Sequence, residues 1–78
     1  MSIQLQLKQA IEEALPGAEA EVTRGVGPGH FNVTVISAGF AGKSIVECHR
    51  LVYSALAPFM EGVDAPVHAV DHLQTRMA

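Results

Sequence analysis

The sequence predicts a small α+β domain in which helices cover one face of a three-stranded mixed sheet. Three observations carry this prediction: an amphipathic helical pattern at residues 2–15, strict strand alternation at 30–37, and a long helical segment before the last strand. Neighbouring antiparallel strands need only a short turn, whereas a parallel crossover needs a dozen or more residues. The predicted order is helix, strand, strand, helix, short helix, strand.

Length and composition limit the possible functions. The chain has 78 residues, of which 49% are hydrophobic, and this predicts a single domain spanning 1–78. The formal net charge of −3 is unfavourable for a phosphate-binding surface. The lone Cys48 excludes an intramolecular disulfide and a cysteine-rich zinc site. No apolar run reaches the ~20 residues of a membrane span. The first residues also lack the basic region of a signal peptide, so we expect a cytoplasmic protein with no membrane partner.

The first half of the chain reads as a helix followed by a hairpin. Ser2 can cap the helix at 2–15, and Pro16 follows its end. Residues 18–24 have the pattern of an edge strand, and 30–37 is the clearest strand of the chain. In that second strand one face carries three apolar side chains, Phe31, Val33 and Val35. The glycine-rich loop at 25–29 is a hairpin connection, because no helix follows it to favour an anion.

The second half predicts a helix at 43–57, a helical turn at 59–62 and a final strand from Val67 to about residue 74. Pro58 is expected to end the regular part of the helix, and 75–78 to fray. Two registers compete for the buried face of the helix. One is the set Ile45, Cys48, Val52, Leu56 and Phe59, and the other centres on Val46, His49, Tyr53 and Leu56.

His68 is an unusual choice in the last strand, which is otherwise apolar at its start. It is either a strand histidine satisfied by backbone or water, or a metal ligand. If the second and third strands are parallel neighbours, His30 and His68 both lie near strand starts at one end of the sheet. His72 lies ~13 Å further along the strand, too far to share an ion with His68. Spacing alone favours the first of these readings.

Most of the chain resembles the BolA family. The residues that carry the resemblance are His30-Phe31-Asn32-Val33-Thr34-Val35, Phe40-Ala41-Gly42-Lys43, His49-Arg50-Leu51-Val52-Tyr53 and Val67-His68-Ala69-Val70. The resemblance implies a fold similar to the class II KH domain and a non-enzymatic role. It also implies a monothiol glutaredoxin as partner, with a [2Fe–2S] cluster shared between the two proteins and glutathione. The isolated protein would hold no cofactor and would be a monomer or a weak homodimer.

In the family, the residue that corresponds to His68 is one cluster ligand, and a Cys or His in the first hairpin loop is the other. The loop at 25–29 contains neither, so His30 is the nearest substitute. Many members have Arg-His-Arg where this chain has Cys48-His49-Arg50, which suggests that position 48 is often solvated. We therefore favour the helix register that buries Val46, His49 and Tyr53. Cys48 itself is a small core residue, a surface thiol or, least favoured, an alternative iron ligand.

Some family members are DNA-binding transcriptional regulators of stress response or morphology, and this is the alternative function. Gly39 and Gly42 form a G-x-x-G pattern, and Lys43, His49 and Arg50 could contact phosphates nearby. The pattern here joins a strand to a helix, so a turn that leads into the helix explains it better. No Ser–His–Asp arrangement or carboxylate pair indicates catalysis, and we expect no enzymatic activity.

Overall fold

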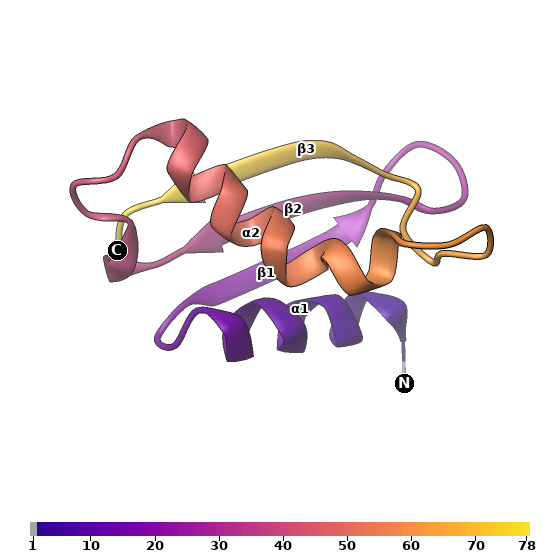
Figure 1. Cartoon of the computed structure of the whole chain (residues 1–78), viewed down its shortest axis with the longest axis horizontal. Coiled ribbons are helices and arrows are strands. Elements are labelled where there is room, and N and C mark those ends of the chain that lie inside the picture. Colours follow the sequence, from indigo (N-terminus) through magenta and orange to yellow (C-terminus); the bar gives the residue numbers. More distant parts are fainter. Residues whose placement is uncertain (1) are drawn as a thin grey trace.

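A three-stranded mixed sheet forms the body of the protein, as the computed structural model of residues 2–78 shows (Figure 1). Its elements, in chain order, are α1 (Ile3–Ala14), β1 (Glu19–Arg24), β2 (His30–Ile36), the 3₁₀ turn η1 (Ala38–Phe40), α2 (Ile45–Met60) and β3 (Ala69–Arg76). β2 lies in the centre, antiparallel to β1 and parallel to β3. The predicted α+β fold and mixed sheet are confirmed. Within residues 2–78, neither helix is long and apolar enough to cross a membrane.

The core lies between the two helices and one face of the sheet. Ser2 caps α1 by accepting the Leu5 N–H at 3.2 Å, and the buried face of this helix carries Leu7 and Ile11. β2 alternates between buried and half-buried residues along its whole length, as predicted. The buried cluster comprises Leu7, Ile11, Ala18, Ala20, Phe31, Val33, Val35, Phe40, Cys48, Val52, Leu56 and Val67.

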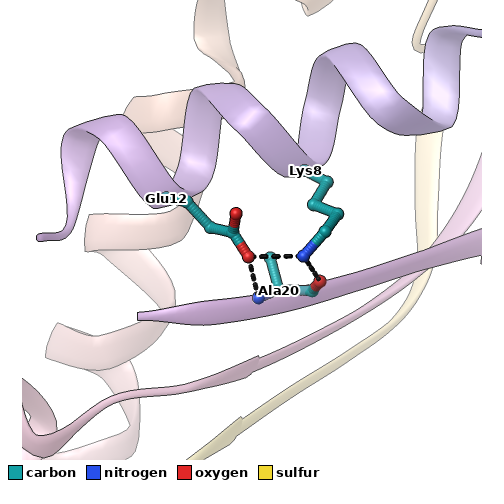
Figure 2. Close-up of polar contacts among 3 residues, drawn as sticks. All are labelled: Lys8, Glu12 and Ala20. Carbon is teal, nitrogen blue, oxygen red and sulfur yellow. Dashed lines mark hydrogen bonds and ion pairs between the residues drawn. The ribbon is translucent and has the colours of Figure 1, made fainter. Parts of the chain in front are cut away.

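Two side chains of α1 tie the helix to the outer edge of β1 (Figure 2). The Glu12 carboxylate accepts the Ala20 N–H at 3.0 Å, and Lys8 Nζ donates to the Ala20 carbonyl at 3.0 Å. Lys8 and Glu12 also pair with each other one helical turn apart. The hydrogen bond from Lys8, followed by the one from the Ala20 N–H, lowers the pKa of Glu12 below its ordinary value. Both backbone groups of Ala20 are therefore satisfied by side chains instead of by another strand.

The register of α2 differs from the one we favoured. Cys48, Val52 and Leu56 are its buried residues, while Val46 is 58% and Tyr53 40% exposed. The prediction of the favoured register was wrong because it rested on the charged residue that related proteins have at position 48, which suggested that this position is exposed to solvent. The i, i+4 series from Cys48 forms the narrow apolar stripe that packs on the sheet.

α2 also runs through Pro58 to Met60, so the separate short helix predicted after Pro58 does not form. Pro58 cannot donate to the Ser54 carbonyl, and the helix continues for only two residues beyond it. At its other end, α2 begins with a capping box in which Ser44 accepts the Glu47 N–H at 3.1 Å and the Glu47 side chain bonds the Ser44 N–H.

β3 begins and ends two residues later than predicted. Val67 is still outside the strand, where its N–H donates to the Phe59 carbonyl at 3.0 Å. Thr75 and Arg76, which we expected to fray, pair in register with Val35 and Ile36. The parallel pairing thus follows β2 to its last residue. Between Phe31 and Asn32 the register shifts, and Asp71 is the additional β3 residue that has no partner there.

Candidate functional site

The loop between β1 and β2 lies beside the entrance to β3, at one end of the sheet (Figure 1). The carbonyl of Gly29 accepts the His68 N–H at 2.8 Å and the Ala69 N–H at 3.2 Å. At the base of the loop, the Gly25 N–H donates to the His30 carbonyl at 2.8 Å. Two segments that are far apart in the sequence therefore form one hydrogen-bonded unit, and this unit holds both predicted histidines.

His68 is exposed and lies one residue before β3. Its imidazole packs against Gly29: a Cβ placed on that glycine would come within 2.9 Å of the ring carbon Cγ. Gly29 has φ +75°, a conformation that non-glycine residues rarely adopt. Among residues 2–78, no side-chain hydrogen bond to the imidazole is formed. Its backbone is thus fixed while both ring nitrogens remain available.

His30 is at the start of β2, and its ring is held by Asp71. Nδ1 of His30 lies 2.7 Å from Oδ1 of Asp71, and the Val26 N–H donates to Oδ2 at 2.9 Å. The hydrogen bond from Val26, and then the one from His30, lowers the pKa of the Asp71 carboxyl. The two side chains are partly buried, at 38% exposed for His30 and 22% for Asp71.

Asp71 is a residue of this site that sequence reasoning missed. The available signal was the pair of consecutive polar residues, Asp71 and His72, which interrupts the alternation expected of a strand. Such an interruption is typical of a β-bulge, which re-aims a side chain next to a functional site. Here the bulge allows the Asp71 carboxylate to reach the loop at Val26.

The register determines which histidines are close to one another. His30 pairs with Ala69, the residue directly after His68, whereas His72 pairs with Asn32 beyond the bulge. The structure therefore brings His30 and His68 to the same end of the sheet and leaves His72 farther along β3. Within residues 2–78, no group of three or more His, Cys, Asp or Glu side chains could hold a metal ion.

The imidazoles of His30 and His68 could supply only some of the ligands that an iron–sulfur cluster needs. Imidazole nitrogens bind iron, and in some [2Fe–2S] centres two histidines replace two cysteines on one iron. The remaining thiolates would have to come from outside residues 2–78, because Cys48 is buried in the core at 5% exposure. That burial agrees with the reading of Cys48 as a small core residue.

The residues proposed for phosphate contact lie on a different part of the molecule. Lys43 and Arg50 are exposed and line a shallow cavity of about 210 Å³ together with Glu47 and Leu51. The carboxylate of Glu47 offsets their charge at this place. His49 is half-buried. The G-x-x-G segment forms the η1 turn and leads into the α2 cap, and φ at Gly42 is +76°. It is therefore a strand-to-helix turn, as expected.

Comparisons with known proteins agree with the fold and with the sequence motifs. The family model described as BolA-like protein matches residues 7–76. The human BolA-like protein 1 is 37% identical over 76 residues, which cover 87% of this chain and 53% of that protein. The chain thus spans about half the length of this curated relative.

Solved structures give the same result. The BolA homologue from Coxiella burnetii superposes with a TM-score of 0.70 at 32% identity, covering 99% of this chain and 92% of that one. The BolA domain of SufE1 from Arabidopsis thaliana superposes with a TM-score of 0.77 at 28% identity, covering 99% and 93%. A match to the family model over nearly the whole chain, supported by these relatives, means that the chain belongs to the BolA family.

Proposed function

We propose that this protein is a non-enzymatic adaptor that binds a monothiol glutaredoxin and shares a [2Fe–2S] cluster with it, in iron–sulfur trafficking or iron regulation. The observation that carries the proposal is that the backbone of His68 is held in place while its imidazole is exposed. Its backbone is anchored to Gly29, and its exposed ring has no hydrogen-bond partner within residues 2–78. An exposed imidazole with both nitrogens free of protein partners is accessible to a metal group carried by a docked protein.

The partner in this proposal follows from what the site lacks. This chain offers imidazoles at His68 and His30, and it offers no exposed thiolate. A cluster of this type needs further ligands, and the cysteine of a monothiol glutaredoxin with the thiol of glutathione would supply them. When bound, the cluster provides iron and sulfide for transfer or for sensing. His68 and His30 would hold it, and the hydrogen-bonded loop at 25–29 would orient them. Free thiols of this kind require a reducing compartment, and we propose the cytoplasm.

The test is co-expression with a monothiol glutaredoxin and measurement of absorption and circular dichroism in the visible range. We expect a coloured heterocomplex with thiolate-to-iron bands. His68→Ala should abolish or alter these bands, because it removes an iron ligand. The isolated variant should still fold, because an exposed ring contributes little to the core. Its thermal midpoint should lie within a few degrees of the parent, the shift that a loss of ~1 kcal/mol in the free energy of unfolding causes in a small domain.

His72→Ala is the matched control, since it removes an exposed histidine of β3 that pairs with Asn32 beyond the bulge. Its heterocomplex should keep the parent spectrum. His30→Ala should change the spectrum if His30 replaces the missing loop ligand. An unaltered spectrum in a correctly folded His68→Ala heterocomplex would refute the proposed role of His68.

A further inference from the structure

The hydrogen bond between His30 and Asp71 determines which nitrogen of His30 is free. A neutral imidazole carries one proton, so one ring nitrogen donates and the other keeps a lone pair. An ionised carboxylate can only accept, and the 2.7 Å contact is made at Nδ1. The proton therefore lies on Nδ1, and Nε2 keeps the lone pair that a metal requires. Histidine ligands commonly donate their second nitrogen to a carboxylate in this way.

Asp71 is itself held from two sides, which gives the arrangement its rigidity. Its second oxygen accepts the Val26 N–H at 2.9 Å, so the carboxylate cannot rotate away from His30 without losing this bond. A Cβ on Gly25 would collide with the same carboxylate, and this shows how closely the loop backbone approaches it. Asp71 also lies at the bulge, where it has no register partner on β2. The bulge, the loop and His30 thus meet at one side chain.

We propose that Asp71 is a positioning residue that holds His30 with Nε2 free, so that His30 serves as the second imidazole ligand in place of a Cys or His in the loop at 25–29. This inference rests on the proposed function for the identity of the metal group. The control of the His30 ring by Asp71 does not depend on the metal group and can be tested on the isolated protein.

The first experiment uses the isolated, ¹⁵N-labelled protein. Long-range ¹H–¹⁵N spectra at mildly alkaline pH distinguish an imidazole protonated at Nδ1 from one protonated at Nε2. We expect His30 to be protonated at Nδ1 in the parent. In Asp71→Ala the Nε2-protonated form should appear, because no carboxylate then fixes the proton. His30→Ala assigns the signals.

Asp71→Leu is the second variant, in case the alanine variant unfolds. It retains much of the volume of the side chain but has no acceptor for either Val26 or His30. Asp64→Ala is the matched control, because Asp64 is an exposed aspartate of the preceding loop for which the structure shows no hydrogen bond. A His30 tautomer that is unchanged in a folded Asp71→Ala or Asp71→Leu variant would overturn the inference.

The second experiment uses the reduced heterocomplex with a monothiol glutaredoxin and measures electron spin-echo modulation from imidazole nitrogens coupled to the cluster. We expect two coupled imidazoles in the parent and loss or weakening of the His30 coupling in Asp71→Ala, with the His68 coupling retained. Two undiminished couplings in Asp71→Ala would overturn the inference while leaving the proposed function intact. A parent heterocomplex without a cluster would instead refute the proposed function, and the tautomer experiment would still decide whether Asp71 controls His30.

Discussion

At the scale of single residues, the site depends on small side chains as much as on the histidines. Gly29 carries the carbonyl that anchors His68 and lacks the Cβ that would displace the imidazole. His68 could be singled out from the sequence, because a histidine that opens an apolar strand is unusual. Asp71 was missed, because its one local signal is the break in alternation at Asp71 and His72. That break does not show that the bulge brings Val26, 45 positions earlier in the chain, next to the carboxylate.

We predict that Gly29→Ala destabilises the protein and moves the His68 ring. An alanine at positive φ costs about 1–2 kcal/mol, and its Cβ would lie too close to the imidazole. Gly27→Ala is the control, because Gly27 also has positive φ, at +90°, but a Cβ there meets nothing within 4 Å. Thermal denaturation should show a loss in both variants. Only Gly29→Ala should shift the His68 ring signals, and equal His68 signals in the two variants would contradict the prediction.

At the scale of elements, the side chains of α1 connect the helix to the sheet. Lys8 and Glu12 lie on one face of the helix, one turn apart, and meet the two backbone groups of Ala20 (Figure 2). The sequence predicted this helix and its neighbouring strand, since both follow simple periodic patterns. It did not predict the register of α2, because Cys48, Val46 and Tyr53 are compatible with either face until packing against the sheet selects one.

We predict that Glu12 makes stability depend on pH on the acid side. Its folded pKa lies below the ordinary value, so the carboxylate stabilises the fold above the unfolded pKa. This stabilisation is lost as pH falls through the lower, folded value. Glu12→Gln should therefore unfold at a lower temperature than the parent at neutral pH, and the difference should shrink in acid. The measurement is the thermal midpoint as a function of pH.

Glu13→Gln is the control for this measurement, since Glu13 is the exposed neighbour, one position along the helix, and its side chain forms no hydrogen bond or ion pair within residues 2–78. It should follow the parent profile. A Glu12→Gln profile parallel to that of the parent over the whole acid range would show that ionisation of Glu12 does not contribute to stability.

At the scale of the whole molecule, the topology was predictable because it follows from few facts. A hairpin-length loop makes β1 and β2 antiparallel, and a helical crossover makes β2 and β3 parallel. That topology alone brings the starts of β2 and β3, and with them His30 and His68, to one end of the sheet. The boundaries of α2 and β3 were less predictable, because Pro58 is tolerated near a helix end and pairing with β2 extends β3.

We predict weak nucleic-acid binding with a shallow dependence on salt. The chain carries a net charge of −3, and Glu47 lies beside Lys43 and Arg50 on the surface that would contact phosphates. Few counterions would be released on binding, so the slope of affinity against salt should be small. Fluorescence anisotropy with a labelled duplex checks this. Sub-micromolar binding at physiological salt would favour the DNA-regulator alternative over the adaptor.

The contact of Lys8 and Glu12 with Ala20 also limits how copies of this protein can polymerise. A sheet with two free borders can add neighbours on both sides and grow into a fibre. Here α1 runs along the outer border of β1 and occupies its hydrogen-bonding groups at Ala20 (Figure 1). Another strand could pair along this border only by displacing Lys8 and Glu12 from Ala20, so β3 presents the less obstructed border. Strand addition between copies would therefore favour pairs joined through β3 over an extended fibre.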